Sequence, residues 1–110
     1  MISIGINPIS VNALYTGKRH LTKKGKEMKE HYVGCIDNQW NKKIISDLVS
    51  VTFNFHFTDN RRHDIDGPLK ALLDSMTGIV YEDDSQVDEL HVFKFRNTKE
   101  ARVDIFIAKL

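Results

Sequence analysis

The sequence has little of what marks disulfide-bonded, zinc-binding or membrane proteins. One of its 110 residues is cysteine, which excludes a disulfide within the chain, and no Cys/His set has zinc-binding spacing. No apolar run approaches the roughly 18 residues of a transmembrane helix, and the first residues lack the charged and apolar regions of a signal peptide. These absences predict a cytoplasmic protein without a membrane partner.

The chain has instead the composition of an ordinary globular domain. It is 41% hydrophobic and 28% charged. Domains most often hold roughly 100–150 residues, so we expect one domain over residues 1–110. A chain of this size buries about two-thirds of the surface that its unfolded form exposes, which is enough for one core.

The net charge of +1 conceals blocks of opposite sign. Residues 17–43 hold eight basic and three acidic side chains, a net charge of +5. Residues 59–89 hold three basic and nine acidic side chains (−6), and residues 90–110 hold five basic and two acidic side chains (+3). A total near zero by itself argues against a nucleic-acid partner, but the separated blocks allow one. They are either solvated faces or a metal site inside a polyanion-binding surface.

Hydrophobic periodicity predicts the order of the secondary-structure elements. In chain order they are a strand near residues 2–6, a helix from about Thr22, strand 51–58, helix 66–77, and strands 87–96 and 101–109. Trp40, Ile44, Ile45 and Leu48 either extend the first helix or form a separate segment. Residues 97–100 are predicted to join the last two strands as a hairpin. The order predicts an α+β fold with two main helices and a mixed, mostly antiparallel sheet of about four strands.

A group of acidic residues surrounds the second predicted helix. Asp64 and Asp66 lie two residues apart before it, Lys70 lies one turn beyond Asp66, and Asp83 and Asp84 follow the helix in a turn. If the next strand returns beside strand 51–58, the turn comes back near the first two carboxylates. Clustered carboxylates repel one another unless a cation joins them, and oxygen ligands alone suit Mg²⁺. This pattern indicates metal-dependent phosphoryl chemistry, with Lys70 neutralising phosphate charge.

Each member of this group also has a structural interpretation. Asp66 is equally suited to cap the helix, and Asp83 and Asp84 to form a solvated turn. Lys70 can be an i,i+4 partner of Asp66 and Asp74. Spacing alone leaves these alternatives open.

Several of these segments resemble the RusA family of Holliday junction resolvases of bacteria, prophages and phages. The residues that carry the resemblance are 61–70 (RRHDIDGPLK), 73–74 (LD) and 78–87 (GIVYEDDSQV), with the Ser/Asn/Tyr loop 10–15 (SVNALY). It implies a dimeric endonuclease that uses Mg²⁺, for which Mn²⁺ can substitute, and no organic cofactor. Such enzymes resolve four-way junctions by paired symmetric nicks in DNA recombination and repair.

The resemblance also implies residue roles. The catalytic residues it implies are Asp64, Asp66, Lys70 and Asp84, and the metal ligands are the same three aspartates with Asp83 beside them. Residues expected to contact DNA are Asn12, Tyr15, Lys18, Arg19, Lys23, Lys24, Arg61 and Arg62. Tyr15 is expected to stack on an unpaired base or to pack within the protein, and the basic residues to hold phosphates without reading sequence.

Two residues depart from the family pattern. Gly67 stands where the family often has Asn, and His63 stands where it has Arg. His63 is either a phosphate contact or, as the simpler interpretation, a surface turn residue. The departures leave junction selectivity open, so a broader branched-DNA or flap endonuclease and a catalytically silent junction-binding protein remain alternatives.

Overall fold

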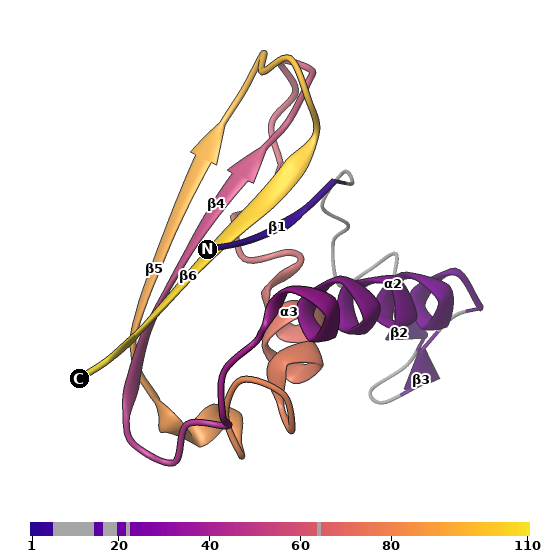
Figure 1. The fold of residues 1–110 in the computed structure, drawn as a ribbon. Coiled ribbons are helices and arrows are strands. Elements are labelled where there is room, and N and C mark those ends of the chain that lie inside the picture. Colours follow the sequence, from indigo (N-terminus) through magenta and orange to yellow (C-terminus); the bar gives the residue numbers. More distant parts are fainter. Residues whose placement is uncertain (6–14, 17–19, 22, 64) are drawn as a thin grey trace.

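The computed structural model describes residues 1–5, 15–16, 20–21, 23–63 and 65–110. Their main feature is a sheet of four strands with two helices on one side of it (Figure 1). The strands are β1 (Ile2–Ile4), β4 (Val49–His56), β5 (Val87–Phe95) and β6 (Arg102–Lys109), and the helices are α2 (Lys23–Gln39) and α3 (Leu69–Met76). A two-stranded ribbon of β2 (Tyr15–Thr16) and β3 (His20–Leu21) and a short 3-10 helix, η1 (Asp84–Gln86), complete the described elements. The predicted α+β class is confirmed.

The strands lie in the order β1-β6-β4-β5. β6 pairs antiparallel with β1 and with β4, whereas β4 and β5 are parallel. The predicted hairpin between the last two strands is therefore wrong, because β4 lies between them. Backbone bonds explain the crossing: the amide of Phe57 donates to Phe95 and the amide of Thr98 donates back to Phe57, so the connection passes over the end of β4. Alternation predicts that a segment is a strand, but it does not specify the partner.

The central strand β4 separates the two faces of the sheet. Val49, Val51, Phe53 and Phe55 are all buried beneath the helices, and the intervening residues point to the opposite face. They form the core together with Ile4, Val103, Ile105 and residues of both helices. This core covers one face of the sheet only.

Helix α2 ends where side-chain bonds fix its last turn to the sheet. The side chain of Gln39 accepts a hydrogen bond from the backbone amide of Ser3 and donates one to its carbonyl, both 2.8 Å long. The helix therefore ends at Gln39, and residues 40–48 form a separate segment that leads into β4. None of the helices in the described ranges is long and apolar enough to span a membrane.

Helix α3 is shorter than the predicted helix 66–77. It begins at Leu69, after a turn that contains Gly67 and the N-cap residue Pro68. It ends at Met76 before Gly78, whose φ of +84° is strained for any residue with a Cβ. The prediction that this glycine terminates the helix is confirmed.

Candidate functional site

The acidic turn after α3 is organised by its own side chains. The carboxylate of Asp83 accepts a hydrogen bond from the amide of Ser85 (3.0 Å), and the side-chain carbonyl of Gln86 accepts from the amides of Glu82 and Asp83 (both 2.9 Å). This is a reciprocal capping box that begins η1. The hydrogen bonds from Ser85 hold the pKa of Asp83 below its usual range, so this carboxylate stays ionised.

The same glutamine also fixes the turn to the rest of the fold. Its side-chain amide donates to the carbonyls of Ile45 (2.7 Å) and Asp47 (2.9 Å), in the segment before β4. The amide of Ile45 in turn donates to the carbonyl of Val80 (2.8 Å). This role of Gln86 was not predicted from the sequence, although the spacing Asp83-x-x-Gln86 is the capping-box signature that indicates it.

Asp84 is left free by this arrangement. Its side chain is exposed, and within the described part of the chain its carboxylate accepts no hydrogen bond and forms no ion pair. Two adjacent aspartates therefore differ in role. Asp83 shapes the turn, and Asp84 presents a carboxylate on a fixed backbone.

Tyr81 connects the turn to the end of α3. Its side chain is completely buried, and its hydroxyl donates to the carbonyl of Leu73 (2.7 Å). Burial raises the pKa of this phenol first of all, and the negative charges of Asp84, Asp74 and Asp83 raise it further. The elements that carry these carboxylates, α3 and the acidic turn with η1, contact each other.

The other predicted site residues lie at the start of α3. Asp66 is exposed in the preceding turn, and its backbone carbonyl accepts from the amide of Leu69 (3.2 Å). Its carboxylate does not cap the helix, because Pro68 occupies the N-cap position without a side-chain bond. The alternative that Asp66 is the helix N-cap is therefore wrong. Lys70 is exposed on the first turn of α3.

The parallel pairing changes how the two acidic segments approach each other. Val87 pairs with Val49, so η1 lies at the start of β4, whereas the chain leaves for Asp66 from the opposite end of that strand. Helix α3 contacts η1 and so leads the chain back to the start of β4. No group of three His, Cys, Asp or Glu side chains able to hold a metal occurs among the described residues, and Asp64 lies outside them. The predicted ligand set thus stays a prediction.

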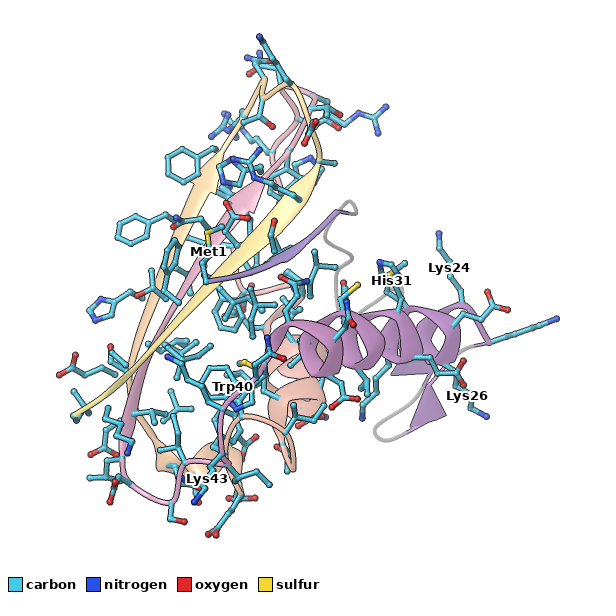
Figure 2. The ribbon with its side chains drawn as sticks, viewed as in Figure 1. Met1, Lys24, Lys26, His31, Trp40 and Lys43 are labelled. Atoms are coloured by element: carbon cyan, nitrogen blue, oxygen red, sulfur yellow. The ribbon has the colours of Figure 1, made fainter. Side chains whose placement is uncertain are left out.

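The predicted DNA contacts lie at separate places in the fold. Lys23 and Lys24 are exposed at the first turn of α2, and Figure 2 shows Lys24 at the end of the helix that is remote from Trp40. Arg61 and Arg62 are exposed in the loop after β4. Tyr15 lies in β2, where its backbone pairs with Leu21. The predictions for Asn12, Lys18 and Arg19, and for the side chain of Tyr15, fall outside the described part.

His63 has a structural environment. Its ring stacks on Phe57 with centroids 3.9 Å apart, and its Nε2 lies 2.8 Å from the carboxylate of Asp59. That hydrogen bond lowers the pKa of Asp59. The backbone carbonyl of His63 accepts a hydrogen bond from the side chain of Lys94 in β5. These contacts agree with the simpler interpretation, a turn residue that fixes the loop after β4.

Comparison with known proteins shows a likeness along almost the whole chain. The sequence model of the family described as Endodeoxyribonuclease RusA matches residues 7–108. Crossover junction endodeoxyribonuclease RusA of Shigella sonnei is 28% identical over 107 residues, which cover 94% of this chain and 89% of the relative. The protein of the same name from Escherichia coli strain K12 gives the same values, and that of Enterobacteria phage 82 is 27% identical over the same shares. The matched range includes both acidic segments.

Proposed function

The chain belongs to the RusA family of endodeoxyribonucleases, and from this premise we propose that it resolves Holliday junctions by paired, metal-dependent nicks. The observation that carries the proposal is the exposed carboxylate of Asp84, which a rigid turn holds without an internal partner beside α3. The relative from phage 82 supports a bacterial or phage origin, and the proposed place of action is the cytoplasm.

The donor set fits a hard divalent cation. Asp64, Asp66 and Asp84 offer only carboxylate oxygens, which Mg²⁺ prefers and Mn²⁺ also accepts. The bound ion supplies charge stabilisation at the phosphodiester and favours deprotonation of the attacking water. Asp83 adds a second negative charge beside Asp84, and the bonds of Gln86 keep the turn from moving as charge builds up.

Lys70 has a distinct role in the proposal. Its side chain is exposed on the first turn of α3, and Asp66 lies in the turn that directly precedes this helix. A cation there neutralises a non-bridging oxygen or the leaving oxygen of the scissile phosphate. Lys23, Lys24, Arg61 and Arg62 hold the duplex arms through phosphates.

A homodimer completes the proposal. Two symmetric nicks require two sites, and two-fold symmetry matches the symmetry of the junction. The sheet face that carries no helix exposes three phenylalanines, Phe93 (52% exposed), Phe95 (43%) and Phe106 (41%). An apolar patch of this kind on a small protein favours a partner, and a second copy of the chain supplies the matching surface.

The proposal is tested by cleavage of a synthetic four-way junction. The protein is incubated with the junction in Mg²⁺, in Mn²⁺ and in EDTA, alongside linear duplex, fork and flap substrates. We expect metal-dependent paired nicks in the junction alone. Comparable cutting of forks and flaps points to a broader branched-DNA nuclease, and binding without metal-dependent cutting points to a silent junction-binding protein.

Single substitutions test the roles of the site residues. Asp66→Asn and Lys70→Ala are each expected to abolish cutting while junction binding stays within about twofold. Asp37→Asn, an exposed carboxylate on α2, is the matched control and cuts normally. Normal cutting by Asp66→Asn would disprove the assigned mechanism.

A further inference from the structure

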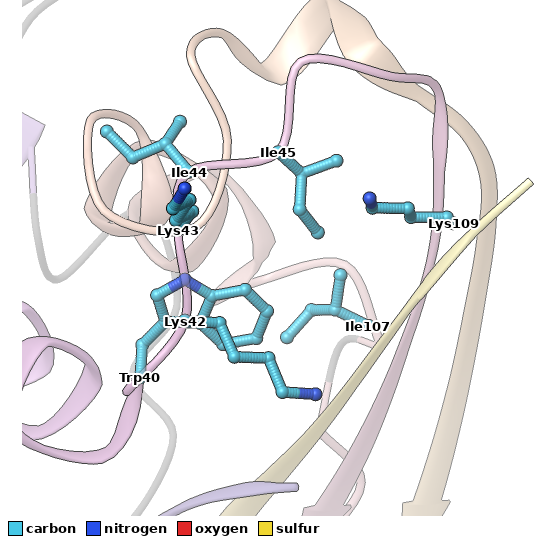
Figure 3. A pocket seen from close by; sticks show the side chains of 7 residues that line it. All are labelled: Trp40, Lys42, Lys43, Ile44, Ile45, Ile107 and Lys109. Atoms are coloured by element: carbon cyan, nitrogen blue, oxygen red, sulfur yellow. The ribbon is translucent and has the colours of Figure 1, made fainter.

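A basic pocket lies between the segment after α2 and the end of β6, and the predicted site does not include it. It has a volume of about 330 Å³. Figure 3 shows the Trp40 ring among the lining side chains, with Ile107 beside it and Lys42 passing over its edge. Three lysines, Lys42, Lys43 and Lys109, lie around apolar residues that include Ile45. We call this the Trp40 pocket.

The lining carries positive charge without matching negative charge. No carboxylate is among the residues that form the pocket. Lys109 lies 3.9 Å from Asp47, but both side chains are mostly exposed, so this ion pair is weak. Lys42 stands over the Trp40 ring at 5.7 Å from its centroid, a contact that does not neutralise charge. An occupant with anionic groups is therefore favoured.

Trp40 itself offers a flat apolar ring, and its side chain is half-buried. The ring packs partly against the core, which fixes its orientation. Its indole N–H is buried, yet it has no hydrogen-bond partner among the residues that the structure describes. Buried donors in native proteins normally have a partner. Because this N–H is not exposed to solvent, a ligand in the pocket contacts the Trp40 ring rather than the donor.

A second hollow continues from the first. It has a volume of about 210 Å³ and shares Trp40, Lys42 and Ile107 with the Trp40 pocket, adding the amide side chains of Gln39 and Asn41. The Trp40, Lys42 and Ile107 side chains thus border both hollows. This extent suits a stretch of chain with repeated anionic groups better than a single ion.

Hydrogen bonds connect the wall of the Trp40 pocket to the acidic turn. Ile45 lines the pocket, and its carbonyl accepts the hydrogen bond from Gln86, while its amide donates to Val80. The backbone that forms one wall of the pocket therefore also holds the turn that presents Asp84. The pocket is thus connected to the proposed ligand Asp84 through the hydrogen bond between Ile45 and Gln86.

We propose that the Trp40 pocket binds an unpaired segment of DNA strand, with a base against Trp40 and phosphates at Lys42 and Lys43. This inference rests on the proposed function, because branched DNA supplies unpaired or distorted nucleotides next to the cleavage point. Stacking on an aromatic ring and phosphate contacts to lysine are the usual means by which proteins hold single strands. The pocket then positions the strand to be cut.

Intrinsic fluorescence provides the test, because Trp40 is the sole tryptophan of the chain. The protein is titrated in EDTA with a ten-residue oligothymidylate, with thymidine monophosphate and with inorganic phosphate. We expect the oligonucleotide to quench the emission strongly, the nucleotide weakly and phosphate not at all. Quenching by phosphate equal to that by the oligonucleotide, or no quenching by the oligonucleotide, would contradict a base contact.

Charge substitutions locate the binding. Lys42→Gln with Lys43→Gln removes two phosphate contacts, which should weaken oligonucleotide binding about tenfold and lower the slope of log K against log salt by roughly 1.4. The matched control is Lys26→Gln with Lys29→Gln on α2, which changes the net charge equally and lies outside the pocket. Equal losses in the two double variants would overturn the proposal.

The outcomes for the Trp40 pocket and for the proposed function are separable. If the protein fails to cut a junction but its fluorescence still responds to the oligonucleotide in a manner dependent on Lys42 and Lys43, the nuclease proposal fails and the pocket stands. If the wild type cuts and the pocket double variant binds and cuts like its control, the pocket proposal fails alone.

Discussion

The two faces of the sheet differ in what covers them. On the helix side, Val51, Phe53 and Phe55 of β4 are completely buried, and the layer of α3 and η1 carries the free carboxylate of Asp84. On the open side, the alternate residues of β4 are polar, and Phe93 and Phe106 flank them with about half of each side chain exposed. Apolar side chains beneath the helices form the core, whereas those on the open face are partly exposed.

The contrast assigns different tasks to the two faces. The proposed chemistry belongs to the helix layer, where hydrogen bonds from Gln86 and Tyr81 fix the turn. The proposed dimer contact belongs to the open face, where Phe93 and Phe106 are each about half exposed. Substitutions on one side should therefore leave the function of the other side intact.

The largest effect is expected on the helix side. Asp84→Ala removes a proposed metal ligand and should lower junction cutting about a thousandfold (~4 kcal/mol in the barrier). Because Asp84 makes no internal bond, thermal stability and dimer formation should stay unchanged. Cleavage kinetics, melting curves and light scattering measure the three quantities. Cutting within tenfold of wild type would remove Asp84 from the site.

The open face is expected to show the opposite behaviour. Phe93→Glu with Phe106→Glu puts charges into the proposed interface and should weaken dimer formation roughly a hundredfold (~2.7 kcal/mol). Sedimentation at micromolar concentration should show a monomer whose circular dichroism matches the wild type. Glu89→Gln with His91→Gln, exposed on the same strand, is a control without a loss of apolar surface. A stable dimer in the double phenylalanine variant would place the interface elsewhere.

Loss of the hydrogen bonds that Gln86 makes around the acidic turn should have a smaller effect, and this effect is on stability. Gln86→Ala removes four hydrogen bonds and leaves the carbonyl of Ile45 without its partner, which should cost about 2 kcal/mol of unfolding free energy, roughly 10 °C in melting temperature. Gln86→Glu keeps the acceptor for Glu82 and Asp83 but loses both donated bonds, so an intermediate loss is expected. Equal stability of all three proteins would show that the hydrogen bonds of Gln86 do not stabilise the fold.

The sequence predicted the local pattern of the fold better than its pairing. The alternation in β4 and the stop at Gly78 follow from residue periodicity and backbone conformation, and both are present. The partners of β5 and β6 depend on bonds between Phe57, Phe95 and Thr98, which are distant in sequence. Helix α3 starts three residues later than predicted because Gly67 and Pro68 form a turn.

The candidate site was predictable as a set of residue types but not as a division of roles. The spacing Asp83-x-x-Gln86 favours Asp83 as the cap of the turn, but only the structure shows that the amide of Ser85 bonds to Asp83 and that Asp84 keeps an exposed carboxylate. The Trp40 pocket was not predictable, because it joins the segment after α2 to β6 across the sheet edge. Contacts between distant segments decide such features, and a single sequence does not contain them.

The smallest effect concerns a polar cluster on the open face. Asp104 of β6 is buried (6% exposed) and accepts hydrogen bonds from Ser3 (2.7 Å) and Arg102 (3.1 Å), with His56 3.3 Å away. Burial alone raises the pKa of Asp104, but the hydrogen bonds of Ser3 and Arg102 and the charges of Arg102 and His56 outweigh it and lower the pKa. The ionised form is therefore the one that the fold stabilises.

The sign of this shift fixes its pH dependence. A carboxyl whose folded pKa lies below its unfolded value of about 3.9 stabilises the protein fully above that value, and the contribution is lost as the pH falls through the folded pKa. Asp104→Asn should thus cost about 1 kcal/mol at pH 7, and the difference from wild type should shrink progressively as the pH falls below the unfolded value of about 3.9. Urea unfolding between pH 3 and 7 measures this. The difference should persist in the phenylalanine double variant, because the cluster lies within one chain; its disappearance there would show that Asp104 stabilises the interface between copies instead.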